Sequence, residues 1–120
     1  MDLLEIFKDS DDLVSHPAGA VIIMEGAEGS DMYVVMQGEV DISLKGKVIS
    51  KASRGDIVGE MALINVDIRS ATVTAITDCT LAVIDQASFQ SLLRHVPDFS
   101  MHVMSVLADR LKLAYEMIAD

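Results

Sequence analysis

A chain of 120 residues, 51% of them hydrophobic, is long enough to bury the core of a single domain. Its formal net charge of −10 argues against nucleic-acid binding, which depends on clustered basic side chains. One cysteine, Cys79, excludes an internal disulfide and fits a reducing compartment, with the thiol expected in the core. Neither a signal peptide nor an apolar run of membrane-spanning length is visible, so we expect a cytoplasmic protein without membrane contact.

The first two thirds of the chain predict a short helix and then a series of short strands. Leu3, Leu4 and Phe7 share one face of a helix over 2–7, and the Asp- and Ser-rich residues 8–19 predict a loop. Turns are expected at Lys45-Gly46-Lys47 and at Arg54-Gly55-Asp56. Many short strands at short spacing favour a rolled or closed β structure over a parallel sheet. The expected strands are 20–24, 32–36, 39–44, 47–50, 56–58, 71–76 and 79–84.

The last third predicts two helices. Residues 86–95 form the first, with Asp85 as its N-cap and Phe89, Leu92 and Leu93 facing inward. Pro97 suits the first turn of a longer helix that reaches about Ile118.

The longer helix carries two apolar rows, whereas an ordinary surface helix has one. We therefore expect it to pack on its own strands and on a partner helix, giving a homodimer; a helix sunk deep in one groove is the alternative. Arg110 interrupts the second row, either as a rim residue or facing a ligand. The seam assigned to the partner, named the α-seam below, is Met101, Met104, Ala108, Leu111, Tyr115 and Ile118; the second row is Phe99, Val103, Val106, Leu113 and Met117.

The stretch 58–71 has the residue types that hold a phosphorylated sugar. Gly59 lets a backbone approach a ligand closely, and Arg69 offers a planar, permanently charged fork for two phosphate oxygens. Ser70 adds a hydroxyl, and Ala71 leaves the next peptide N–H approachable. Glu60 accepts hydrogen bonds only and suits a sugar hydroxyl. The alternative reading is a surface ion pair between Arg69 and Glu60, worth little energy.

This stretch resembles the phosphate-binding cassette of the cyclic nucleotide-binding domain family. Residues 58–75 fit the family order of an apolar residue, Gly-Glu, a small residue, a spacer, Arg, a hydroxyl residue and Ala. An earlier signature also fits: 22–29, then 32–35, then Gly38. The resemblance implies a mostly β fold with flanking helices in one domain, 1–120. It consists of a jelly-roll-like β-roll over about 18–85, followed by C-terminal helices over about 86–118, the last one long.

The family also implies a role for each site residue. Arg69 would pair with the cyclic phosphate, helped by Ser70 and the peptide N–H of Ala71, and Glu60 would accept from the ribose 2′-hydroxyl beside Gly59. Met61 and Ala62 would line the pocket floor. The C-terminal helix would cover the base through Arg110, Leu111, Ala114 and Tyr115. Val58 and Ile68 depart from the family's frequent Phe and Pro without removing a polar contact.

The resemblance implies a non-enzymatic sensor that binds cyclic AMP, favoured over cyclic GMP because Ser70 follows the Arg where cyclic GMP binders tend to have Thr. The three histidines lack the spacing of a metal site or a nucleophilic set, and Glu25, Glu28 and Asp31 are better explained as turn acids than as calcium ligands. Two alternatives remain: a scaffold or dimerisation domain that has lost its ligand, and the sensor fragment of a larger transcription regulator, channel or kinase. No helix-turn-helix follows the long helix within these residues, so direct DNA binding is not expected.

Overall fold

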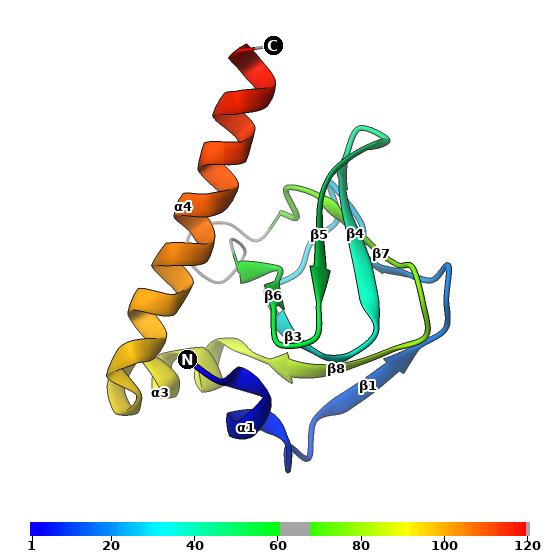
Figure 1. Cartoon of the computed structure of the whole chain (residues 1–120). Coiled ribbons are helices and arrows are strands. Elements are labelled where there is room, and N and C mark those ends of the chain that lie inside the picture. Colours follow the sequence, from blue (N-terminus) through cyan, green and yellow to red (C-terminus); the bar gives the residue numbers. More distant parts are fainter. Residues whose placement is uncertain (61–67, 120) are drawn as a thin grey trace.

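The computed structural model describes residues 1–60 and 68–119. Within them, the strands build a roll and the helices lie along one side of it, with the long C-terminal helix standing upright beside the strands (Figure 1). The helices are α1 (Leu3–Phe7), α3 (Gln86–His95) and α4 (Pro97–Ala119). The strands are β1 (Leu13–His16), β2 (Val21–Ile23), β3 (Met32–Gln37), β4 (Glu39–Leu44), β5 (Lys47–Ser53), β6 (Ile57–Val58), β7 (Thr72–Ala75) and β8 (Cys79–Ile84).

These strands form two four-stranded antiparallel sheets in the order β1-β8-β3-β6 and β2-β7-β4-β5. The predicted β-roll with flanking helices is therefore confirmed. The β4–β5 turn is confirmed as well: Lys45 and Gly46 have φ values of 51° and 82°, as a two-residue hairpin turn of the mirror-image type requires.

The expected loop over 8–19 is wrong in part, because it contains β1. This strand pairs with β8, from Leu13 opposite Ala82 to His16 opposite Cys79. It has four residues, none of them buried, so its sequence has no strong alternation of apolar side chains. Its strand conformation comes from hydrogen bonds to β8, a partner more than 60 residues away along the chain. β5 also extends to Ser53, past the expected end at residue 50.

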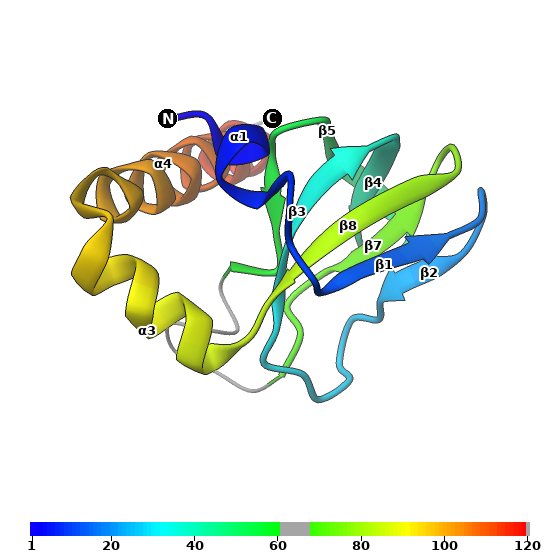
Figure 2. The ribbon, with the colours of Figure 1, turned by 90° about the horizontal axis from the view of Figure 1, so that it is seen from below.

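The core has two parts, one on each face of the sheet that contains β3 and β8. Between the two sheets lie Val35, Val40, Leu81 and their neighbours, with Cys79 buried among them as predicted. On the other face, Met32, Val34 and Ile84 pack against the helices, which cover that face in Figure 2. Because β3 and β8 are covered on both faces, they contain nearly continuous apolar runs.

A helix cap and an aromatic contact hold α3 and α4 in place. Asp85 caps α3 as predicted: its carboxylate accepts from the Ser88 N–H at 2.8 Å, and this bond lowers the pKa of Asp85. The rings of Phe89 on α3 and Phe99 on α4 meet edge to face at 5.8 Å between centroids. In the described residues, no helix has the length and apolarity needed to cross a membrane.

Candidate functional site

Arg69 is held by the β2–β3 loop, residues 24–31. The Arg69 N–H donates to the Ala27 carbonyl at 2.8 Å, and the Gly26 N–H donates to the Arg69 carbonyl at 2.9 Å. At the far end of the side chain, Nη1 donates to the Asp31 carbonyl at 2.7 Å. Both ends of Arg69 are therefore fixed by one loop, and the residue is buried, with 8% of its surface exposed.

Within the part of the chain that the structure describes, the Arg69 guanidinium pairs with no carboxylate. The Asp31 carbonyl that accepts from it is neutral, and a guanidinium has five N–H donors. Burying a charge without a counter-charge is costly. The arrangement therefore suits an anion that supplies both the charge and further acceptors.

Gly59 lies directly against this guanidinium. Its φ is +78°, in the left-handed region where a side chain is strained. A Cβ at Gly59 would also lie 3.1 Å from the Asp31 carbonyl oxygen and 3.2 Å from Arg69 Nη1. Conformation and space both favour glycine here, because the Gly59 backbone lies close to Arg69 and to the Asp31 carbonyl.

Glu60 is buried, at 2% exposure, and its partner comes from α4. Arg110 Nη1 forms an ion pair with Glu60 Oε1, and Arg110 Nη2 donates to the Ile57 carbonyl at 2.7 Å. The reading of Arg69 and Glu60 as a surface ion pair is therefore wrong: both side chains are buried, and each has a different partner.

The second carboxylate oxygen, Glu60 Oε2, is buried and has no hydrogen-bond partner among the described residues. A buried acceptor without a donor costs free energy, since it has lost its hydrogen bonds to water. A hydroxyl donor placed beside it would remove that cost. Glu60 thus combines a structural contact through Oε1 with an open acceptor at Oε2.

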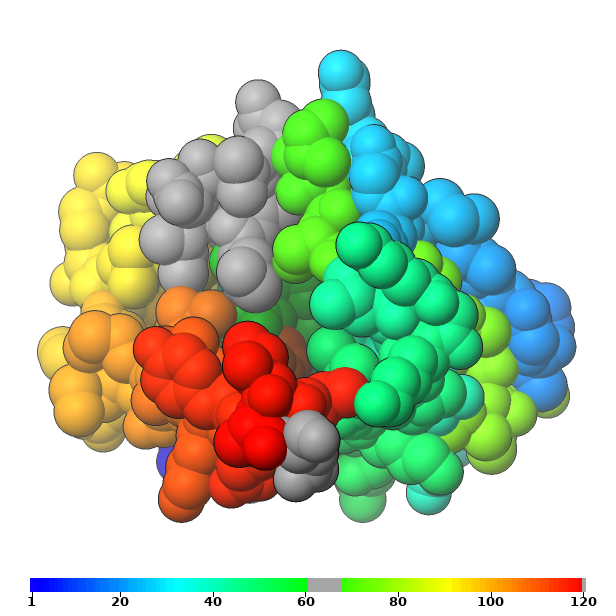
Figure 3. Space-filling model, turned by 90° about the horizontal axis from the view of Figure 1, so that it is seen from above, coloured from blue at the N-terminus to red at the C-terminus, as the bar shows by residue number. Residues whose placement is uncertain are grey.

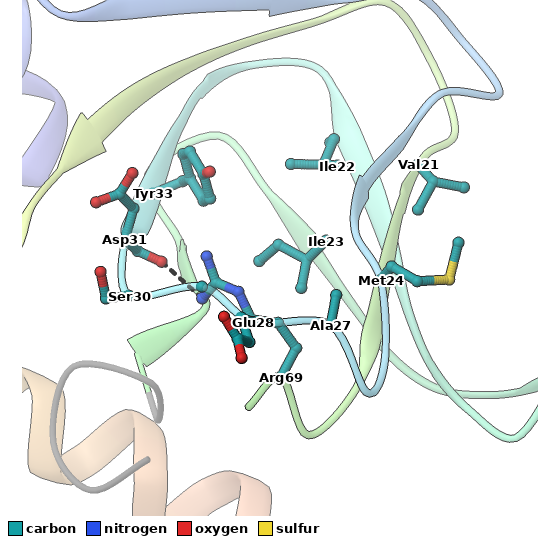
Figure 4. A pocket seen from close by; sticks show the side chains of 11 residues that line it. Val21, Ile22, Ile23, Met24, Ala27, Glu28, Ser30, Asp31, Tyr33 and Arg69 are labelled. Atoms are coloured by element: carbon teal, nitrogen blue, oxygen red, sulfur yellow. Dashed lines mark hydrogen bonds between the residues drawn. The ribbon is translucent and has the colours of Figure 1, made fainter. Parts of the chain in front are cut away.

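A cavity of about 500 Å³ opens beside Arg69 (Figure 4). Its lining comes from β2, from the β2–β3 loop and from Tyr33, and its volume is in the range of small-molecule pockets. Burial raises the pKa of Tyr33; the Arg69 guanidinium opposes that rise, and the carboxylates of Asp31 and Asp12 add to it.

The remaining residues predicted for the site are in different surroundings. Ser70 is exposed and Ala71 half-buried, immediately before β7. On α4, Arg110 reaches the roll, whereas Leu111 and Tyr115 are 53% and 63% exposed and Ala114 is exposed too. Met61 and Ala62 lie outside the described residues.

Sequence reasoning missed the contributions of Ile23, Gly29 and Asp31, which all lie beside Arg69. Asp31 is explained as a turn acid by the sequence alone, but its backbone carbonyl is the group that contacts the arginine. The available signal was the glycine and acid cluster at 25–31. Glu25 from that cluster has a structural role, since its carboxylate accepts from the Lys45 N–H at 2.9 Å.

Comparison with known proteins also identifies a cyclic nucleotide-binding domain. The family model for the cyclic nucleotide-binding domain matches residues 13–96. A cGMP-dependent protein kinase of Drosophila melanogaster is 41% identical over 80 residues, which cover 67% of this chain and 7% of the kinase. The cAMP-dependent protein kinase regulatory subunit of Schizosaccharomyces pombe is 37% identical over 86 residues, covering 71% of this chain and 21% of that protein.

Among solved structures, the catabolite activator protein of Thermus thermophilus matches with a TM-score of 0.79 at 26% identity. The match covers 90% of this chain and 53% of that one. This chain therefore spans a small part of the two kinase proteins and about half of the bacterial protein.

Proposed function

This chain belongs to the cyclic nucleotide-binding domain family, and we propose that it acts as a regulatory domain that takes up cyclic AMP and reports it through α4. The observation that carries the proposal is a pair of buried charged groups with unused hydrogen-bonding capacity. Arg69 lacks a counter-charge among the described residues, and Glu60 has an acceptor oxygen without a donor there. A cyclic nucleotide supplies an anionic phosphate and a ribose hydroxyl, the two groups that these side chains lack.

The phosphate is bound by Arg69. Its fork donates two parallel hydrogen bonds to the phosphate oxygens, and the Ser70 hydroxyl and the Ala71 N–H add neutral donors. Because the chain carries a net charge of −10, the attraction for the anion must be local rather than long-range. Desolvation by the buried surroundings of Arg69 strengthens that local attraction.

The ribose is bound by Glu60. Its Oε2 accepts from the 2′-hydroxyl while Oε1 keeps its ion pair with Arg110. The same carboxylate thereby contacts the ligand and α4.

Seen from above, the molecule is hollowed between the orange and red residues of α4 and the green residues of the roll (Figure 3). We assign the base to this hollow, with α4 covering it through Arg110, Leu111, Ala114 and Tyr115.

A second copy of the chain covers the exposed face of α4 in this proposal. The α-seam is largely exposed, from Met101 at 63% to Ile118 at 81%. An apolar stripe of this kind on a long helix is typical of a coiled-coil partner surface. Pairing through it would place both nucleotide sites beside the dimer interface.

Calorimetric titration with cyclic AMP and cyclic GMP tests the function directly. We expect both to bind, with cyclic AMP preferred because Ser70 follows the arginine. The relatives include a cGMP-dependent and a cAMP-dependent kinase protein, so the competition between the two ligands is the decisive measurement. A clear preference for cyclic GMP would reverse the assignment of the ligand. Binding of neither would favour a scaffold or dimerisation domain that keeps the fold without a ligand.

A further inference from the structure

Gly29 differs from the other glycines of the chain. The chain has seven glycines, and six of them have a positive φ that favours glycine on conformational grounds. Gly29 alone has a φ outside the left-handed region, so its backbone conformation is open to any residue. A reason for glycine at this position has to come from its surroundings.

The surroundings of Gly29 are the Arg69 guanidinium. A Cβ built at Gly29 would lie 2.5 Å from Arg69 Nε and 2.9 Å from both Cζ and Nη2. Real Cβ atoms essentially never lie within 3.0 Å of such atoms, so a side chain at position 29 would force Arg69 to move. Gly26, three residues earlier in the same loop, is the opposite case: its φ is +85° and nothing lies within 4 Å of its Cβ position.

Arg69 has little room to give way within its present position. Gly59 closes the space near Nη1, which is itself bonded to the Asp31 carbonyl. The arginine backbone is fixed to Ala27 and Gly26. A side chain at position 29 would therefore drive the guanidinium out of the gap as a whole, with loss of its bond to Asp31. The fold can survive that movement, because only the end of one side chain must swing.

We propose that Gly29 is a positioning residue: the missing side chain leaves the slot in which Arg69 is aimed at the phosphate. The inference rests on the proposed function for its effect on binding. The slot itself rests on the geometry of Gly29 and Arg69 alone.

The test combines Gly29→Ala with changes at Arg69. In the otherwise unchanged chain, Gly29→Ala should weaken cyclic AMP binding at least about ten-fold by calorimetry. The Tm should fall by only about 2–5 °C, as expected for one displaced contact in a domain of this size. With Arg69→Lys as the background, Gly29→Ala should change the affinity little, because lysine has no planar group to fill the slot. Gly29→Ser should behave as Gly29→Ala does.

Gly26→Ala is the matched control from the same loop. It should lower the Tm through backbone strain, by the same amount with Arg69 or Arg69→Lys. For Gly29→Ala, an equal loss of affinity in both backgrounds, or no loss in either, would overturn the proposal.

A second readout separates this inference from the proposed function. In the Arg69→Ala background the slot is empty, and Gly29→Ala should leave the Tm unchanged or raise it, since alanine restricts the unfolded chain. If the wild type binds neither nucleotide, the proposed function fails and this Tm comparison still decides the role of Gly29. A Tm change that does not depend on residue 69 would refute the slot.

Discussion

Arg69 and Glu60 are both buried and charged, but different parts of the molecule hold them. Arg69 is fixed entirely within the roll, by the β2–β3 loop and Gly59. Glu60 is fixed across a junction, by Arg110 of α4, 50 residues further along the chain. In the proposed site, the phosphate half therefore rests on contacts within the roll, whereas the ribose half depends on where α4 lies.

This difference suggests how binding is reported. A ligand shifts a conformational equilibrium only as far as it prefers one state over the other. A phosphate bound as proposed would contact Arg69, which the β2–β3 loop holds without any contribution from α4 among the described contacts. A hydroxyl on Glu60 contacts a carboxylate whose orientation Arg110 sets. We therefore expect the signal to pass through Glu60 and the affinity to come mainly from Arg69.

Removing Arg69 should have the largest effect on binding. Arg69→Ala leaves a desolvated phosphate without its main partner, which costs about 2–5 kcal/mol. By the usual conversion, that is a loss of about thirty-fold to several thousand-fold in affinity. Arg69→Lys should recover part of it, because a point charge replaces a two-pronged donor. Titration of both variants measures the effect, and a dissociation constant close to wild type would refute the site assignment.

The second-largest effect is expected from removing Arg110, which should lower stability as well as binding. Arg110→Met leaves the buried Glu60 carboxylate and the Ile57 carbonyl without their donor, for a loss of about 1–3 kcal/mol in the free energy of unfolding. Urea denaturation measures this loss. Arg110→Lys should retain part of the stability. If Arg110→Met unfolds at the wild-type urea concentration, the helix is held by its apolar contacts alone and Glu60 does not connect the two parts.

A charge in the α-seam should act on assembly and, more weakly, on the ligand. Leu111→Asp should favour monomer in sedimentation, since the seam is where we place the second copy. Coupling between sites is typically about 1–3 kcal/mol, so nucleotide should shift the wild-type dimer constant several-fold. Lys112→Asp, on the polar line of the same helix, is the control and should leave the dimer largely intact. If the wild type is monomeric at high concentration, with and without nucleotide, the α-seam is not a dimer interface.

The smallest effect concerns the Asp85 cap, outside the site. Its pKa is lowered in the folded state by the bonds from Ser88, so its contribution to stability is present above the unfolded value of 3.8. That contribution is lost as pH falls through the lower, folded value. Asp85→Asn should flatten the stability curve in this acidic range, as thermal melts at several pH values would reveal. Nucleotide affinity at neutral pH should be unchanged, and a marked change would mean that α3 influences the site.

The expectations for α3, α4 and β4, which depended on local pattern, were confirmed. Asp85 caps a helix that runs on with Phe89 buried, and Pro97 begins α4, because capping and helical periodicity are properties of a few neighbouring residues. The alternation of apolar residues in β4 likewise matches its buried positions, Val40 and Ile42. β1 was missed because its conformation depends on pairing with β8 rather than on its own side chains.

The sequence by itself indicated the family, through its resemblance, and the mostly β fold, and it singled out Arg69 and Glu60 as candidate site residues, because each of these follows from residue type and spacing. Only the tertiary structure decided which groups those residues meet. Arg69 meets a backbone carbonyl and a glycine of the β2–β3 loop, and Glu60 meets Arg110 from a helix far along the chain. A carbonyl oxygen and a missing Cβ have no residue-type signature, since every residue has the one and every glycine lacks the other. These groups contribute to the site only because folding brings distant segments of the chain into contact.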